Sequence, residues 1–184
     1  MRGEELPFAM RELDALDTKK RIASDVAGLI ADGEAVGLDS GTTVLEIARV
    51  LAGRRLTAMP LSLHAAMALA GSASVRLMMP GGETRPGELA MVGPLALASI
   101  RALRFDTAVL TCCGMHDGRV TTHNLGDAVV KQAMLRSAAR VIVAADSWPA
   151  TARADRPNFA ASATRILRAP AANSACFTAA SPRS

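Results

Sequence analysis

The chain has 184 residues, half of them apolar, which is enough to bury the core of one domain. It contains no Tyr and few other aromatic residues, so Ala, Leu, Val, Ile and Met must build that core. The net charge of +4 comes from residues 147–184, which hold five Arg and one Asp, while the remainder is neutral overall. A neutral folded part does not attract a phosphate backbone, which argues against a nucleic-acid-binding surface on it.

No stretch of the sequence is long and apolar enough to span a bilayer, and the first residues lack the apolar region of a signal peptide. We therefore expect a soluble, cytoplasmic protein. Adjacent Cys112 and Cys113 are poorly placed to pair, and with Cys176 they show no zinc-ligand spacing, so we expect reduced, partly buried thiols. The three histidines are scattered as well, and the sequence predicts neither a metal site nor a cofactor.

Helix and strand patterns alternate along most of the chain, after a linker-like segment at residues 1–17. The first half predicts helices over 18–33, 42–53 and 63–72, and strands over 34–40, 54–62 and 75–79. The second half predicts loops over 83–93 and 115–124, helices over 94–103 and 125–138, and strands over 105–114 and 140–147. The last two strands are apolar throughout, which indicates an α/β fold with a mostly parallel sheet and helices on both faces.

The regular alternation ends at residue 147. Residues 148–184 are rich in Ala, Pro, Ser and Arg, and only residues 163–167 have a strand pattern. We expect this segment to be an aberrant, poorly ordered tail that leaves an apolar edge or face of the sheet uncovered. The predicted organisation is a linker over 1–17, one domain over 18–147 and the tail over 148–184.

Polar clusters follow the predicted strands at the point where each strand ends. Ligands of open parallel sheets bind beyond the carboxyl ends of the strands, so these clusters should converge on one edge. The clusters are Asp-Ser-Gly-Thr-Thr at 39–43, Pro-Leu-Ser at 60–62, Pro-Gly-Gly-Glu-Thr-Arg at 80–85, residues 112–122, and Ala-Asp-Ser at 145–147.

Residues 39–43 form the cluster best suited to an anion. Gly41 permits a tight turn, and the unpaired amide groups that begin the next helix favour a negative charge such as a phosphate. The alternative is that Ser40 or Thr42 only caps that helix. The sequence alone leaves both interpretations open, although the cluster lacks the Gly-Lys-Ser/Thr of a P-loop.

Two further positions have a functional and a plain structural interpretation. Arg85 suits a bidentate contact to a phosphate or carboxylate, with Gly81 and Gly82 allowing close backbone approach, or it is a solvated side chain beside an ordinary turn. Lys131 either faces a ligand or forms an exposed ion pair with Asp127, four residues earlier on the same helix.

Five motifs in a fixed order resemble the C-terminal sensor domain of DeoR-family transcriptional regulators. They are LDSGTT, MMPGGETRPGELAMVGPLA, LRFDTAVLTCCG, VTTHNLGDAVVKQAM and VIVAADS, and the resemblance covers residues 3–147. It implies a fold like that of ribose-5-phosphate isomerase and related sugar-phosphate enzymes. It also implies a domain that senses a phosphorylated sugar or related metabolite, within a homo-oligomeric regulator that is usually a repressor of sugar-metabolism genes.

The resemblance also implies a set of ligand-binding residues. These are Asp39, Ser40, Gly41, Thr42, Thr43, Ser62, Gly81, Gly82, Arg85, Gly114, Thr122, Lys131 and Asp146. The loop before Ser62 departs from the family pattern Thr-Asn-Ser, so one amide contact is absent.

The family binds DNA through an N-terminal helix-turn-helix, whereas Met1 here lies at the linker. We therefore expect this chain not to bind an operator by itself. Two other functions stay open: a sugar-phosphate isomerase, with Asp39, Asp117 or Asp146 as the general base, and a truncated remnant or dimerisation module.

Overall fold

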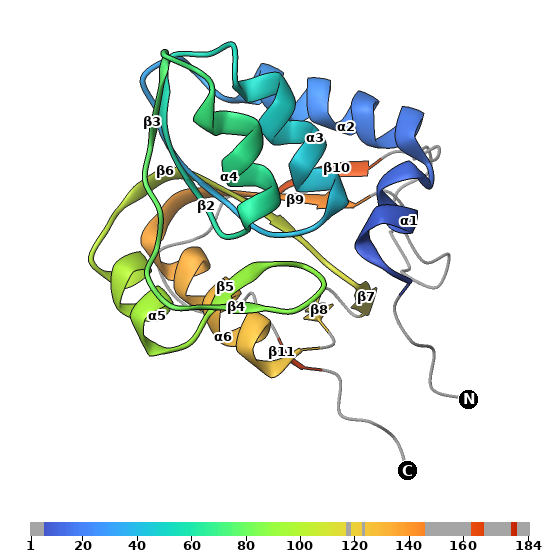
Figure 1. Cartoon of the computed structure of the whole chain (residues 1–184), viewed down its shortest axis with the longest axis vertical. Coiled ribbons are helices and arrows are strands. Elements are labelled where there is room, and N and C mark those ends of the chain that lie inside the picture. The colour runs from blue at the N-terminus through green and yellow to red at the C-terminus, as the bar shows by residue number, and fades with distance from the viewer. Residues whose placement is uncertain (1–5, 117–118, 123, 146–162, 168–177, 180–184) are drawn as a thin grey trace.

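A six-stranded sheet with the strand order β10-β9-β6-β1-β2-β3 lies between two layers of helices (Figure 1). The computed structural model describes residues 6–116, 119–122, 124–145, 163–167 and 178–179. The strands are β1 (Ala35–Leu38), β2 (Leu56–Pro60), β3 (Val75–Leu77), β6 (Phe105–Thr111), β9 (Ala138–Ala145) and β10 (Ala163–Leu167). All neighbouring strands pair in parallel except β10, which runs antiparallel to β9.

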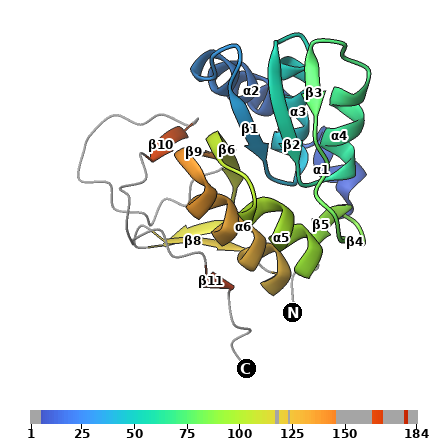
Figure 2. The same cartoon turned by 90° about the vertical axis from the view of Figure 1, so that its left-hand side faces the viewer.

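Each face of the sheet is covered by helices, as the apolar strands predict (Figure 2). One layer consists of α2 (Leu16–Leu29), α3 (Thr42–Leu51) and α4 (Leu63–Ala70), and the other of α5 (Pro94–Arg101) and α6 (Leu125–Ser137). Successive residues of β6 serve opposite layers: Val109 packs with the first, and Ala108 and Leu110 pack with the second. Two cores built mainly from aliphatic residues result.

The order in which the chain adds strands to the sheet changes direction at β1. The chain passes from β1 to β2 and β3 on one side, and then crosses to β6 and β9 on the other. The segments that follow the adjacent strands β1 and β6 therefore lead to helices on opposite faces of the sheet. Such a point is where doubly wound sheets form a ligand-binding crevice.

Two hairpins replace the two predicted loops. Residues 83–93 contain β4 (Glu83–Arg85) and β5 (Ala90–Val92), and residues 115–124 overlap β7 (Gly114–His116) and β8 (Arg119–Thr122). Strands of three or four residues are too short to show an alternating pattern, which explains why they were predicted as loops.

A short helix, α1 (Phe8–Leu13), lies within the segment that resembles a linker. The buried Phe8 ring stacks on His64 of α4, with ring centroids 3.8 Å apart. A six-residue helix shows too little periodicity to be recognised in the sequence.

The strand pattern at residues 163–167 is confirmed as β10, which pairs with residues 141–145 along the edge of β9. Thr178–Ala179 form β11, which pairs with β8. The rest of the expected tail lies outside the described residues. Within the part that is described, no helix is long and apolar enough to cross a bilayer.

Gly82 occupies a position that a side chain would disrupt. Its φ is +119°, and an added Cβ would lie 2.5 Å from the carbonyl oxygen of Val92 in β5. We expect Gly82→Ala to lower the free energy of unfolding by about 2–4 kcal/mol, measured by urea denaturation. The matched control is Gly28→Ala, because a Cβ at this helical glycine meets nothing within 4 Å. The control should be neutral or stabilising by up to about 1 kcal/mol, and equal losses in both variants would contradict this assignment.

Candidate functional site

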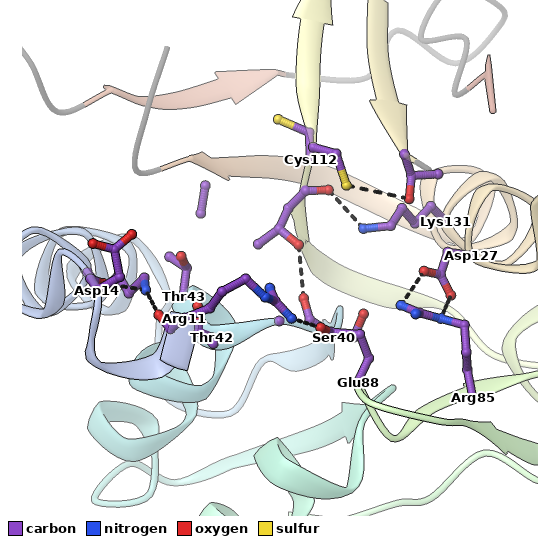
Figure 3. Close-up of a pocket in the computed structure, with 16 residues that line it drawn as sticks. Arg11, Asp14, Ser40, Thr42, Thr43, Arg85, Glu88, Cys112, Asp127 and Lys131 are labelled. Atoms are coloured by element: carbon purple, nitrogen blue, oxygen red, sulfur yellow. Dashed lines mark hydrogen bonds and ion pairs between the residues drawn. The ribbon is translucent and has the colours of Figure 1, made fainter. Parts of the chain in front are cut away.

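A cavity of about 280 Å³ opens beyond the carboxyl ends of β1 and β6 (Figure 3). Its walls come from α1, the starts of α2 and α3, the first half of α6, the β4–β5 hairpin, the end of β6 with the residues that follow it, β8 and β9. The lining residues are Arg11, Asp14, Lys19, Ser40, Gly41, Thr42, Thr43, Arg85, Glu88, Thr111, Cys112, Cys113, Thr122, Asp127, Lys131 and Ala144.

The amino end of α3 forms part of the cavity wall and has no side-chain cap. Gly41 is the N-cap residue, with a φ of 109°. By contrast, Ser62 accepts a hydrogen bond from an amide of α4, and Asn124 does the same for α6. Neither Ser40 nor Thr42 caps α3, so that alternative is wrong, and the first amide groups of the helix lack partners within it.

A buried ion pair lies beneath the cavity. Lys131 of α6 donates its Nζ protons to Asp39 Oδ2 and, at 2.9 Å, to the carbonyl oxygen of Thr111. Asp39 Oδ2 also accepts hydrogen bonds from the backbone amide and the hydroxyl of Thr111, at 2.8 and 3.1 Å. The exposed side-chain fractions are 6% for Lys131 and 2% for Asp39. These contacts join the ends of β1 and β6 to α6.

A second ion pair, between Arg85 of β4 and Asp127 of α6, lies in one side of the cavity wall (Figure 3). The two Arg85 to Asp127 hydrogen bonds measure 3.3 and 2.8 Å, so the contact is bidentate. Burial raises the pKa of the Asp127 carboxyl above its ordinary value, and the Arg85 guanidinium offsets part of that rise. Of the two interpretations of Lys131, the exposed pair with Asp127 is therefore wrong, because both residues are buried and each has a different partner.

The remaining charged residues of the wall come mostly from the first two helices. Arg11 of α1 forms an ion pair with Glu88, which lies between β4 and β5. Lys19 of α2 donates hydrogen bonds to the carbonyl oxygens of Arg11 and Asp14. Four basic side chains thus line the cavity together with three acidic ones.

Seven of the thirteen predicted ligand-binding residues line the cavity, and an eighth, Asp39, lies directly beneath it. The seven are Ser40, Gly41, Thr42, Thr43, Arg85, Thr122 and Lys131. Among the others, Ser62 caps α4, and Gly81 and Gly82 pack against the start of α5. Gly114 begins β7, and Asp146 lies outside the described residues.

Sequence reasoning missed several residues of the wall. Arg11 and Asp14 lie in the predicted linker, where nothing in their spacing indicates a ligand site. Lys19 shares the face of its helix that Ile22 and Val26 bury, but that spacing indicates burial and not a place in the cavity. Thr111 could have been found, since it lies near the carboxyl end of the strand predicted over 105–114, at the expected edge. Cys112 is partly buried as predicted, whereas Cys113 is exposed, and no disulfide joins the two residues.

The chemistry of the cavity suits an anion rather than a metal ion. Basic side chains and the uncapped end of α3 favour negative charge. Among the described residues, no group of three or more His, Cys, Asp or Glu side chains is placed to hold a metal ion.

Comparisons with known proteins bear on this site. A family model described as the DeoR C terminal sensor domain matches residues 14–154. The chain is 35% identical over 146 residues to the transcriptional repressor AccR of Agrobacterium fabrum strain C58, covering 78% of this chain and 57% of that protein. It is 30% identical over 141 residues to the repressor CsqR of Escherichia coli K12, and the match covers 76% of this chain and 54% of that protein.

A third relative is the lactose phosphotransferase system repressor of Lactococcus lactis, 29% identical over 141 residues, with 74% of this chain and 55% of that protein covered. The chain therefore spans just over half the length of these curated relatives.

Solved structures share the fold at low sequence identity. Ribose 5-phosphate isomerase A of Methanocaldococcus jannaschii has a TM-score of 0.50 at 16% identity, covering 70% of this chain and 51% of that one. A D-ribose-5-phosphate isomerase in complex with phospho-erythronic acid has a TM-score of 0.51 at 14% identity, and the match covers 73% of this chain and 53% of that one. The predicted sugar-phosphate-isomerase-like fold is confirmed.

Removing Lys131 should be costly because it leaves the Asp39 carboxylate buried without its cation. We expect Lys131→Met to lower the free energy of unfolding by about 3–5 kcal/mol, measured by urea denaturation. Lys20→Met, at an exposed position of α2, should change it by less than about 0.5 kcal/mol.

Adding Asp39→Asn to Lys131→Met should restore part of the lost stability, since no unpaired charge then remains. A double variant that is less stable than Lys131→Met alone would contradict the buried pair.

Proposed function

This chain belongs to the family of DeoR C-terminal sensor domains, and we propose that it is the part of a transcriptional repressor that binds a phosphorylated sugar or a related anionic metabolite. The supporting observation is the amino end of α3, which opens uncapped into the same cavity that the buried Lys19 lines. Relatives over the same region are named as transcriptional repressors, one of them of a lactose phosphotransferase system.

The phosphate would lie against residues 41–43. There the backbone amides that begin α3 and the hydroxyl groups of Thr42 and Thr43 can donate hydrogen bonds to its oxygens. The partial positive charge of the helix end adds to these bonds. A neutral hydroxyl of an unphosphorylated sugar would gain much less from the same donors.

The sugar would extend from the phosphate toward the Arg85–Asp127 pair. This pair offers guanidinium donors on one side and carboxylate acceptors on the other, which matches the alternating hydroxyl groups of a sugar. A volume of about 280 Å³ is near the lower end of small-ligand pockets, about 300–1,000 Å³, and fits a monosaccharide phosphate better than a nucleotide.

Regulation requires that the ligand bind one arrangement of the repressor better than another. The difference in affinity then sets how far the ligand shifts the occupancy of DNA. We propose that this chain senses the ligand as a homo-oligomer and that DNA contact is made by a helix-turn-helix outside it. Its site of action would be the cytoplasm.

We infer that the chain binds its ligand without converting it. An isomerase needs a general base near the substrate carbon, and the Asp39 carboxylate is already engaged by Lys131 and Thr111. The other two candidate bases, Asp117 and Asp146, lie outside the described residues. Turnover of ribose 5-phosphate or a hexose phosphate would contradict this inference.

The test is a thermal-shift screen that pairs phosphorylated pentoses and hexoses with their unphosphorylated counterparts. At one hundred times its dissociation constant, a true ligand should raise the melting temperature on the order of 5–10 °C. The unphosphorylated counterpart should leave it unchanged at the same concentration. A screen in which no phosphorylated sugar acts, or in which both members of a pair act equally, contradicts the proposal.

A variant at the start of α3 tests the location. Thr43→Val keeps the shape of the side chain and removes one hydroxyl donor, so the dissociation constant for the active sugar phosphate should rise about tenfold. Thr57→Val, on β2 and outside the cavity, is the matched control and should leave it unchanged. Equal affinities of the two variants, measured by calorimetry, would place the phosphate elsewhere.

A further inference from the structure

Lys19 is the most deeply buried basic residue of the cavity wall, with an exposed fraction of 2%. Its ammonium group donates to the carbonyl oxygens of Arg11 and Asp14, the second at 2.6 Å. The other three basic lining residues each have a carboxylate partner: Glu88 for Arg11, Asp127 for Arg85 and Asp39 for Lys131. Within the described residues, Lys19 forms no ion pair.

A buried charge without a counter-charge is costly, and two carbonyl oxygens offset only part of that cost. An ammonium group has three donors, and the hydrogen bonds to these two carbonyl oxygens leave the third donor and the positive charge for another acceptor. Lys19 lines the same cavity as Thr42 and Thr43, where the proposed phosphate would lie. An anion there would provide the missing counter-charge.

The same ammonium group also holds the carboxyl end of α1. Arg11 belongs to the last turn of this helix, and Asp14 is its C-cap residue. A cation at this position satisfies free carbonyl groups and interacts favourably with the helix dipole. Lys19 therefore contacts both the cavity and α1, and Figure 3 shows Arg11 and Asp14 on the side of the cavity where Thr42 and Thr43 lie.

The other contacts of α1 include its buried Phe8 ring, which stacks on His64, and two ion pairs. Arg11 pairs with Glu88, and Glu12 pairs with Arg49 of α3, whose side chain is half exposed. A solvent-exposed ion pair contributes at most about 1 kcal/mol. A helix of six residues is too short to be stable by itself, so its docking depends on tertiary contacts such as those of Lys19.

We propose that Lys19 binds the anionic group of the ligand and thereby couples occupancy of the cavity to the docking of α1. The inference rests on the proposed function, because it requires an anion at the start of α3. Since α1 is the first helix that the structure describes, its docking is the route by which the ligand would influence a segment on its amino-terminal side.

The test uses the whole chain and inorganic phosphate as the probe, with sodium chloride at equal ionic strength as the reference. Amide hydrogen exchange of α1 is followed together with phosphate affinity. In the wild-type chain, phosphate at ten times its dissociation constant should slow exchange of the Met10, Arg11 and Asp14 amides by up to about tenfold. Exchange in α1 that does not respond while phosphate binds overturns the coupling.

Lys19→Gln is the matched variant, because the glutamine amide can still donate to the carbonyl groups that end α1 but carries no charge. We expect it to weaken phosphate binding about tenfold and to abolish the response of α1. The control is Lys20→Gln, at the exposed neighbouring position, which should behave like the wild type. If Lys19→Gln binds phosphate as tightly as the control, the assignment of Lys19 is overturned.

The outcomes separate this inference from the proposed function. A wild-type chain that binds neither phosphate nor any sugar phosphate contradicts the proposed function, and the role of Lys19 falls with it. Binding that is insensitive to Lys19→Gln contradicts only the role of Lys19. The exchange measurement on the wild type requires no variant, so it decides the coupling even if Lys19→Gln fails to fold.

Discussion

The buried ion pair between Asp39 and Lys131 is the interaction on which the site depends. It joins the end of β1 to α6, and through Thr111 it also holds the end of β6. These elements come from distant parts of the chain, and they meet where the strand order reverses. A charge pair removed from water tolerates little displacement, because loss of either partner leaves the other buried and unpaired. The pair therefore fixes the geometry of the cavity.

Charge balance in the cavity explains why an anion is the expected ligand. Arg11, Arg85 and Lys131 are each neutralised by a carboxylate, so most of the wall is polar without strong net charge. The unsatisfied groups lie together, at the uncapped start of α3 and at Lys19. By contrast, the starts of the neighbouring helices α4 and α6 are capped by the side chains of Ser62 and Asn124. A site with free donors and a free positive charge at one end selects for a phosphate-like group there.

The fold was largely predictable because it follows from simple patterns. Fully apolar stretches at β6 and β9 predict a parallel sheet, and parallel strands bring the loop at 39–43 to the same edge as the residues after β6. Residue type alone made Arg85 and Lys131 candidates for ligand binding, and the resemblance of five motifs added Thr122. The two hairpins and α1 were missed because segments of three to six residues carry no readable periodicity.

The sequence could not predict which charged side chains form ion pairs with one another. Spacing on α6 suggests that Lys131 pairs with Asp127, but burial brings Asp39 closer to it and Arg85 closer to Asp127. Gly81 and Gly82 match a ligand-loop pattern, yet they serve close packing against α5. Helical spacing places Lys19 on the buried face of α2, with Ile22 and Val26, but its contacts with the carbonyl groups of α1 could not be predicted because α1 itself was not.

The central claim is that the start of α3 is an open anion site, whereas the starts of its neighbours α4 and α6 are closed by side-chain caps. The most direct measurement is a titration of the wild-type chain with inorganic phosphate, followed by the amide resonances of residues 41–43 in NMR spectra. We predict saturable shifts at these amides and none at the capped starts of α4 and α6. Shifts of similar size at all three helix starts, or none at 41–43, would contradict the claim.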